Sequence, residues 1–177
     1  MGLWTKEVCL GKGCITRQIL LKLPSKGEIN MPALTNYAES GILNFLFRSN
    51  TNSFAAPSRI AIGLCSIVPG ETATGDNCNE LAFANGYGRK DLGAPSNATW
   101  TEITQSAESS GLIDNVSALQ FGPATADWGY VSGVVLCDNY GVGSGNVLMY
   151  GALPTPRDVK NGDIFQFSIG SIDILFG

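Results

Sequence analysis

Residues 128–137 read Trp-Gly-Tyr-Val-Ser-Gly-Val-Val-Leu-Cys and carry the strongest β-strand signal in the chain. Aromatic and β-branched residues dominate this segment, and such side chains pack well on a pleated sheet. Similar short segments flank it at residues 59–68, 100–103, 117–121 and 146–153, with turn-forming residues between them. Many short strands at this spacing predict a mainly β protein, an antiparallel β-sandwich of the jelly-roll type.

The C-terminal segment, residues 164–176, contains a change of buried face. Its apolar side chains fall first on odd and then on even positions, namely Phe165, Phe167 and Ile169, followed by Ile172, Ile174 and Phe176. A strand cannot change its buried face without an extra residue, so we expect a β-bulge or a sharp bend at Gly170-Ser171. Asn161-Gly162 predicts a tight turn just before this segment, and Asn85-Gly86 predicts another.

One segment, residues 33–48, has the spacing of a helix. Its apolar residues recur at steps of three and four, which is the repeat of one helical face: Leu34, Tyr37, Ala38, Ile42, Phe45 and Leu46. Pro32 stands before the segment, where its missing N–H does not weaken a helix. An apolar stripe at this spacing usually faces the core, so we expect these side chains to be buried.

The composition argues against catalysis. The chain of 177 residues suits one domain, and charged residues make up only 15% of it, which leaves fewer barriers to burying surface between subunits. It contains no histidine, which excludes Ser-His-Asp triads, Cys-His dyads and histidine-containing metal sites. We therefore expect no enzyme, no catalytic residues, no cofactor and no metal site.

Three local patterns that suggest chemistry have simpler explanations. Gly141 to Asn146 is glycine-rich like a phosphate-binding loop, but no Lys-Ser/Thr pair and no helix follow it, so we interpret it as a hairpin loop. Asp127 precedes Trp128 and reads as a turn aspartate that accepts backbone hydrogen bonds. A glycan hydrolase needs two facing carboxylates, and the sequence indicates no such pair.

The five cysteines are odd in number: Cys9, Cys14, Cys65, Cys78 and Cys137. At least one is therefore unpaired within the chain, and no CxxC pair points to a zinc ribbon. Cys65 and Cys137 lie in apolar segments and are predicted to be buried thiols. We expect reduced cysteines and assembly in a reducing cytoplasm. No apolar run approaches 18 residues, so neither a membrane span nor a signal peptide is expected.

Charge divides the chain into two parts. Residues 1–30 hold five basic and two acidic residues, a net charge of +3, whereas residues 31–177 hold six basic and thirteen acidic residues, a net charge of −7. We interpret residues 1–30 as an extended basic N-terminal arm and residues 31–177 as a helix plus β-sandwich domain. The basic residues are too widely spaced to predict nucleic-acid binding.

The arm also contains apolar residues that are candidates for contact with a partner chain: Trp4, Ile19, Leu20, Leu21 and Leu23. The run from Ile19 to Leu23 is suited to adding a strand to the exposed sheet edge of a neighbouring subunit, with main-chain hydrogen bonds supplying the affinity. We expect residues 31–177 to fold without this arm, because they hold the helix and every strong strand signal.

Several motifs in residues 31–177 occur in a consistent order. They are Ala33 to Glu39, Ile42 to Arg48, Pro57, Ile62 to Cys65, Gly86 to Arg89, Phe121 to Gly129, Tyr150 to Leu153 and Asn161 to Phe167. In these motifs the chain resembles a family of tailed-bacteriophage virion proteins, often labelled phage tail fibre proteins. The most specific motif is Phe121 to Gly129, and the resemblance covers about four fifths of the chain. It implies a non-enzymatic structural protein of the virion, assembled in the bacterial cytoplasm.

Two functions follow from this resemblance. The first is an oligomeric capsid decoration (cement) protein, whose arm clamps neighbouring subunits and whose partners are its own copies in a homotrimer, the major capsid protein or other virion proteins. The second is a tail fibre or adhesin that binds a receptor on the host surface. Long fibres need sequence repeats or heptads, and neither is found here, whereas an exposed loop aromatic such as Tyr140 would favour the adhesin.

Overall fold

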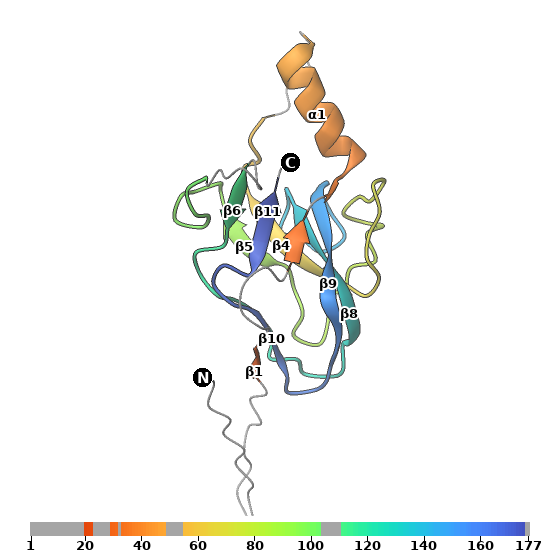
Figure 1. Cartoon of the computed structure of the whole chain (residues 1–177). Helices are drawn as coiled ribbons and strands as arrows, with labels where there is room; N and C mark the ends of the chain where they lie inside the picture. The colour runs from red at the N-terminus through yellow and green to blue at the C-terminus, as the bar shows by residue number, and fades with distance from the viewer. Residues whose placement is uncertain (1–19, 23–28, 32, 49–54, 104–110, 176–177) are drawn as a thin grey trace, which may run out of the picture.

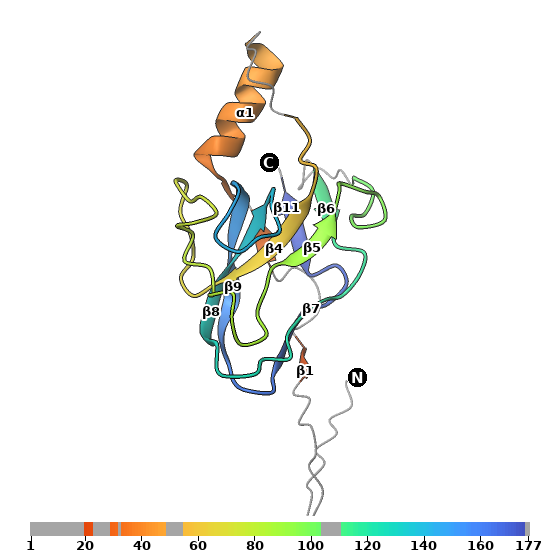
Figure 2. The ribbon, with the colours of Figure 1, turned by 180° about the vertical axis from the view of Figure 1, so that it is seen from behind.

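The computed structural model describes residues 20–22, 29–31, 33–48, 55–103 and 111–175. These residues form a β-sandwich with one helix, which confirms the predicted fold class (Figure 1). The helix rises from one end of the sandwich and the first strand lies at the opposite end, in both the front view and the view from behind (Figure 2). In the described part of the chain, no helix has the length and hydropathy needed to cross a membrane.

One layer of the sandwich is a five-stranded antiparallel sheet in the order β3-β9-β8-β4-β5. Its strands are β3 (Ala33–Leu34), β4 (Ile60–Cys65), β5 (Lys90–Gly93), β8 (Gly129–Cys137) and β9 (Val147–Val159). The segment with the strongest strand signal, β8, is central and pairs with β4 and β9. Its position explains the apolar composition, because a central strand with both faces covered has few polar positions.

The second layer consists of two three-stranded sheets, β1-β10-β7 and β2-β11-β6. Their strands are β1 (Leu20–Lys22), β2 (Ile29–Met31), β6 (Leu112–Asp114), β7 (Leu119–Phe121), β10 (Ile164–Phe167) and β11 (Ile172–Leu175). The two middle strands, β10 and β11, follow each other in the chain, and so do β6 and β7. The two sheets therefore follow one another along the chain, and each strand of one is succeeded by a strand of the other across a bend. β1 and β2 pair in parallel with the middle strands, and β6 and β7 pair antiparallel with them.

The predicted bend at Gly170-Ser171 is confirmed, because the chain leaves one sheet there and enters the next. Gly170 has a φ of +64°, a conformation that glycine adopts without strain. Phe165 and Phe167 before the bend, and Ile172 and Ile174 after it, are buried as the change of face predicted. Ile169 lies in the bend itself and is exposed, in contrast to the strand pattern that included it.

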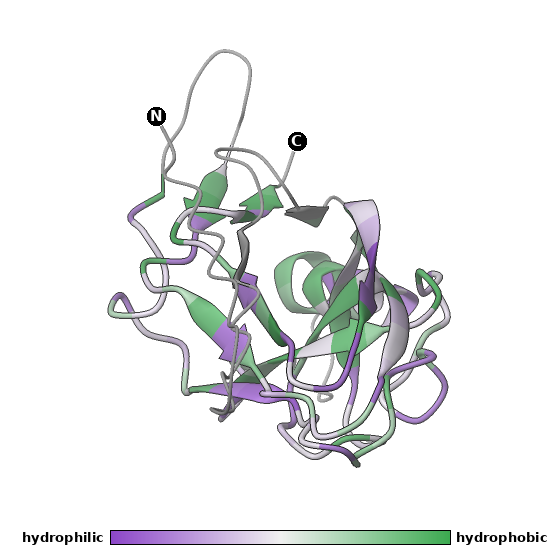
Figure 3. Cartoon of the chain, turned by 90° about the horizontal axis from the view of Figure 1, so that it is seen from below, coloured by the Kyte–Doolittle hydropathy of each residue, from purple (hydrophilic) through white to green (hydrophobic). Residues whose placement is uncertain are grey.

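The main core lies between the two layers. Phe121, Phe165 and Phe167 from the second layer form edge-to-face ring pairs with centroid separations of 5.1–6.3 Å. They pack with Ile62, Leu64 and other apolar side chains of the five-stranded sheet. Figure 3 shows how hydrophobic residues are distributed along the strands and α1 (Asn36–Phe47).

A second, smaller core lies on the other face of the five-stranded sheet. Cys65, Cys78 and Cys137 pack there with Ala73, Val135 and Val147. All three thiols are buried and none is in a disulfide, as predicted for Cys65 and Cys137. Cys9 and Cys14 lie outside the described residues. Burial on both faces explains why every residue of β4 is buried and not only Ile60, Ile62 and Leu64.

Three sequence predictions were wrong in their extent. Residues 100–103 form no strand, because Trp100 makes only an isolated bridge with Asn115. β9 continues beyond residue 153 through two prolines, which are tolerated because residues 153–156 bulge opposite Ser132 and leave the ladder. The helix begins at Asn36 instead of residue 33, because Ala33 and Leu34 pair with β9 as β3.

Candidate functional site

Among the described residues, the hydrogen bonds that anchor helix α1 to the sandwich lie at its N-terminal end. Thr35 caps the helix, since its Oγ1 accepts a hydrogen bond from Ala38 N at 3.4 Å and donates one to Val147 O. The backbone N–H groups of Thr35 and Asn36 donate to Leu148 O at 3.1 Å and to Glu71 O at 2.9 Å. From this anchor the helix extends away from the body of the domain (Figures 1 and 2).

The exposed side of α1 is apolar. Its large exposed side chains in the C-terminal half are Leu43, Phe45, Leu46 and Phe47, and we call these four residues the α1 apolar face. Phe45 is 70% exposed and Phe47 is 78% exposed. At about 100° per residue, the four side chains span an arc of about 200° around the helix axis. A helix packed on one neighbour needs an apolar stripe only about 100° wide.

This exposure corrects the sequence prediction for the helix. Leu34 packs against the main core and Ala38 is buried, as expected. Tyr37, Phe45 and Leu46 were expected in the core, but they are exposed. The helix leaves the sandwich after its first turns, so the sheet cannot cover its second half. An apolar repeat at helical spacing predicts that one face of the helix is buried. The described residues of this chain leave the α1 apolar face exposed.

The size of the α1 apolar face marks it as a candidate binding surface. Phenylalanine contributes roughly 200 Å² when fully buried, so Phe45 and Phe47 alone leave about 300 Å² exposed. Monomeric soluble proteins rarely expose contiguous apolar patches larger than a few hundred Å². Helices of about a dozen residues are also marginal in water without packing, so α1 is stabilised if a partner covers this face.

Of the predicted partner-contact residues in the arm, only Leu20 and Leu21 lie in the described part of the chain. They belong to β1, which pairs in parallel with β10 of the same chain, with Leu20 opposite Ile164 and Leu21 opposite Phe165. Trp4, Ile19 and Leu23 lie outside the described residues, so their role in partner contact stays a prediction. The arm segment does form a strand at a sheet edge, here within its own chain.

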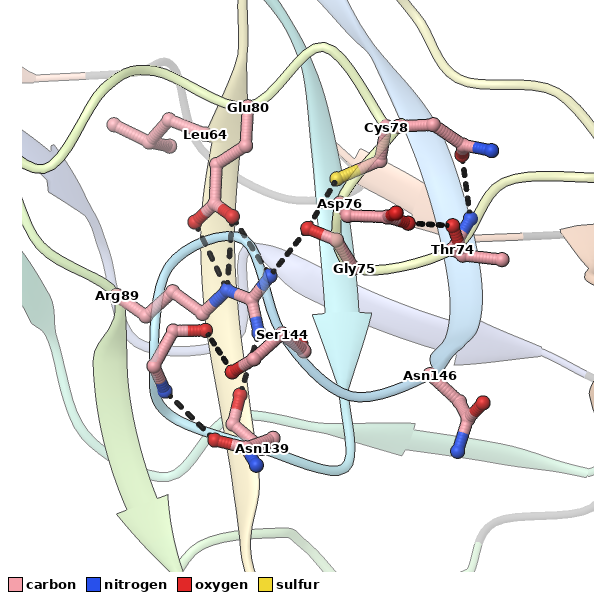
Figure 4. Close-up of polar contacts among 12 residues, drawn as sticks. Leu64, Thr74, Gly75, Asp76, Cys78, Glu80, Arg89, Asn139, Ser144 and Asn146 are labelled. Carbon is pink, nitrogen blue, oxygen red and sulfur yellow. Dashed lines mark hydrogen bonds and ion pairs between the residues drawn. The ribbon is translucent and has the colours of Figure 1, made fainter.

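A buried polar cluster lies beneath the loops at one edge of the five-stranded sheet (Figure 4). Arg89 forms a bidentate ion pair with Glu80, with Nε–Oε1 and Nη2–Oε2 distances of 2.9 and 2.7 Å. The two side chains are 0% and 4% exposed. Tyr87 donates from its hydroxyl to Glu80 Oε1 at 2.8 Å and accepts from Leu64 N at 2.8 Å.

The cluster holds two loops in place. Arg89 also donates to the carbonyl oxygens of Asn139, Ser144 and Gly75 at 2.7, 2.8 and 3.3 Å. Burial acts to lower the pKa of Arg89, but the hydrogen bonds to Glu80 and the electrostatic attraction of Glu80, Cys137 and Cys78 together outweigh it, and the pKa is raised. Burial raises the pKa of the Tyr87 hydroxyl. The guanidinium thus stays charged and its partners are internal, so the cluster acts as a structural tie between loops.

The glycine-rich loop directs carbonyl oxygens inward, whereas a phosphate would need N–H donors. It joins β8 to β9, which confirms the predicted hairpin loop. The carbonyl oxygens of Asn139 and Ser144 point at the Arg89 guanidinium, so the loop surrounds a cation of its own chain. Tyr140 in this loop is 57% exposed, with the Arg59 guanidinium 5.0 Å from its ring centroid. It is an exposed loop aromatic of the kind that receptor contact would use, and that use stays a prediction.

The carboxylates have structural partners too. Asp127 accepts a backbone hydrogen bond from Asn161 N at 2.9 Å, but this donor is 34 residues away and not, as the sequence had suggested, in the turn of Asp127 itself. Lys160 Nζ lies 3.1 Å from Asp127 Oδ2. Asp114 and Asp173, which the sequence did not connect, stand opposite each other on β6 and β11. Burial and the hydrogen bond that protonated Asp173 donates to Asp114 raise the pKa of Asp173 to about 6. Carboxyl groups in direct contact leave no room for the sugar that a glycosidase holds between them.

The comparisons with known proteins agree with the virion resemblance. A family model described as podophage GP4 fiber I protein gp80 matches residues 33–175. This match includes α1, every strand from β3 to β11 and the buried polar cluster. A search of the curated proteins finds no match.

Proposed function

The chain belongs to the family of the podophage GP4 fiber I protein gp80, and from this premise we propose that it is a homotrimeric, non-enzymatic subunit of a fibre-type virion structure. Membership makes it a structural protein of a bacteriophage virion. The single observation that carries the finer proposal is the α1 apolar face, which needs covering by partners. The family name favours a fibre over the capsid decoration role.

The geometry of α1 supports a trimer over a dimer. In a dimer each helix packs against one neighbour, which covers about half of a 200° arc. In a three-helix bundle each helix contacts two neighbours, so Phe45, Leu46 and Leu43 can all be buried. Glu39 is the one charged residue within α1, so assembly around an axis brings little like charge together.

The oligomer is tested by matched substitutions on α1. Leu46→Glu places a charge in the α1 apolar face, and Asn44→Glu places the same charge two residues earlier, about 200° around the helix on the opposite side. We expect trimers of the unchanged chain and of Asn44→Glu, and monomers of Leu46→Glu, by light scattering after size-exclusion chromatography. A monomeric unchanged chain at micromolar concentration would contradict the proposal.

A capsid decoration protein is the second candidate, and the β1–β10 pairing favours it. β1 completes an edge of the second layer in parallel with β10, and the same hydrogen bonds form equally well between the arm of one subunit and β10 of the next. Such strand exchange would produce the predicted clamp between neighbouring subunits. The basic arm and the acidic remainder of the chain attract each other, which favours either arrangement.

Copy number distinguishes the two candidates. Quantitative mass spectrometry of purified particles gives the number of subunits per virion, and labelled antibodies give their position in electron micrographs. A few to a few tens of copies at the tail support the fibre. Hundreds of copies spread over the head would reject the fibre in favour of decoration.

A further inference from the structure

Two of the three thiols in the second core, Cys65 and Cys78, lie at the two ends of one loop. Cys65 ends β4, and Cys78 lies at the end of the loop that follows, residues 66–78. Their exposed fractions are 0% and 1%. The two residues belong to the same cluster of packed apolar side chains.

The backbone brings the segment around Cys78 alongside the end of β4, where Cys65 lies. Cys65 forms an isolated antiparallel bridge with Glu80, and Ser66 N donates to Asn79 O at 3.0 Å. These contacts lay the chain around Cys78 along the end of β4. Cys78 is two residues from Glu80, the bridge partner of Cys65, and both thiols pack in the second core.

We propose that Cys65 and Cys78 form a latent disulfide site, which small-molecule disulfides close into a covalent tie between β4 and the loop of residues 66–78. This modification goes beyond the structural role proposed above. It would give the subunit a cross-link that is absent during assembly and present afterwards.

The loop is already held in the position that the disulfide requires. Gly75 N donates to Gly145 O at 3.0 Å, and Arg89 Nη2 donates to Gly75 O at 3.3 Å (Figure 4). Cys78 Sγ lies 3.8 Å from the same Gly75 oxygen. Because these contacts restrain the loop in the reduced state, little further ordering is needed to bring the sulfurs together, which favours the intramolecular reaction.

The acidities of the two thiols set the order of the reaction. The hydrogen bond from Cys65 lowers the pKa of Cys78 to about 7, whereas Cys65 has its pKa raised. The thiolate is the nucleophile, so Cys78 attacks the small disulfide when the loop opens. One small thiol leaves, and Cys65 then loses its proton and displaces the second from Cys78 Sγ. Two protein thiols are oxidised and one small disulfide is reduced to two thiols.

Cys137 provides an internal control in the same core. Burial raises its pKa to about 12, so it remains a protonated thiol. It lies on β8 opposite Ala61, on the strand next to Cys65. Cys137 packs in the same core as Cys65 and Cys78. If Cys65 pairs with Cys78 and not with Cys137, the pairing reflects the relative position of these two thiols and not merely the presence of three thiols in one core.

The cellular setting supplies the change of redox state. A bacterial cytoplasm keeps thiols reduced, whereas virion surfaces are exposed to oxidising surroundings after release. Only this timing depends on the proposed function. The cross-link itself is tested on the isolated chain. A negative result would therefore leave the fibre role standing, and a wrong fibre role would leave the cross-link standing.

The test is a peptide map of the full chain, purified under reduction and then incubated with oxidised glutathione at pH 8. Free thiols are alkylated in denaturant, and cleavage after Glu71 and Glu80 places Cys65 and Cys78 on different peptides. We expect these two peptides to be joined, and the Tm to rise by about 5 °C or more until reductant is added.

The variants separate this pair from the other thiols. Cys78→Ser and Cys65→Ser should abolish the oxidation-dependent rise in Tm, and Cys137→Ser should retain it. The map of the unchanged chain does not depend on how well any variant folds. Free Cys65 and Cys78 after oxidation, a glutathione adduct on Cys78, or pairing of either residue with Cys137 would overturn the proposal.

Discussion

At the scale of single residues, the Glu80–Arg89 ion pair is a buried charge pair whose two partners depend on each other. Each partner is almost completely buried, and each is satisfied by the other and by Tyr87 or loop carbonyl oxygens. Attraction within such a pair is offset by the loss of hydration, so its net contribution to stability is small. Removing one partner is different, because the remaining charge stays buried without compensation.

We therefore predict that Arg89→Leu lowers the free energy of unfolding by about 3–5 kcal/mol. The double variant Arg89→Leu with Glu80→Gln should recover part of this loss, because no charge is then left unpaired. Urea unfolding at neutral pH measures both values. Equal stabilities of Arg89→Leu and the unchanged chain would show that water reaches Glu80.

Asp173 gives a second residue-scale prediction, on pH. Its pKa is raised to about 6 by burial and by Asp114, so the folded chain binds a proton there more tightly than the unfolded chain does. Ionisation of Asp173 therefore disfavours folding above about pH 6. We predict that stability rises as the pH falls from 7 towards 4, and that Asp173→Asn removes this rise.

Thermal unfolding of the two chains between pH 4 and pH 8 checks this sign. Asp91 and Asp127 have pKa values lowered by hydrogen bonds to Arg59 and Asn161, respectively, so they act in the opposite direction and at lower pH. Both residues are present in both chains, so their contributions to the pH dependence of Tm cancel when one Tm curve is subtracted from the other. A difference that does not change with pH would contradict the raised pKa.

At the scale of elements, Asn115 holds the bend of the second layer together. Its Oδ1 accepts from the backbone N–H groups of Ser171 and Ile172 at 3.0 and 2.9 Å. Its Nδ2 donates to the carbonyl oxygens of Ser117 and Ser168 at 2.7 and 2.8 Å. One buried side chain thus joins the β6–β7 connection to the β10–β11 connection, at the point where both strands change sheets.

We predict that Asn115→Ala lowers the free energy of unfolding by about 3 kcal/mol, because buried backbone groups lose their partners. Asn115→Asp keeps the acceptor oxygens and loses the donor, so it should fall between Ala and the unchanged chain near neutral pH. Urea unfolding of the three chains tests the order. If Asn115→Ala matched the unchanged chain, the bend would be held by the strands alone.

At the scale of the whole molecule, β1 and the first two residues of β2 belong to residues 1–30 and complete the second layer. They cover one edge of β10 and β11, and such edges carry unpaired N–H and C=O groups when exposed. Met31, the last residue of β2, is fully buried, and the predicted boundary between residues 30 and 31 falls inside this strand.

We predict that residues 31–177 alone still unfold in one cooperative thermal transition, because both layers of the main core remain. Loss of β1 should leave the β10 edge open to other chains, so association should increase at high protein concentration. Calorimetry and light scattering test the two effects, with the full chain as control. A chain of residues 31–177 without a cooperative transition would show that the arm is part of the folding unit.

Local patterns were sufficient for features that depend on neighbouring residues. β8, the bend at Gly170-Ser171 and the turn at Asn161-Gly162 all followed from short segments. The burial of Cys65 followed in the same way. In each case, the periodicity of the side chains or the preferences of the turn residues determine the local backbone conformation. A short segment of sequence is therefore enough to predict it.

The tertiary structure alone decided which distant groups meet and what covers each apolar face. Glu80 with Arg89 and Asp114 with Asp173 pair through the arrangement of strands, for which the sequence carries no local signal. The repeat of apolar residues in α1 was correctly read as a helix, but Phe45 and Leu46 are exposed. Apolar periodicity shows that a face avoids water. Whether its own sheet or another subunit covers that face depends on where the helix leaves the domain.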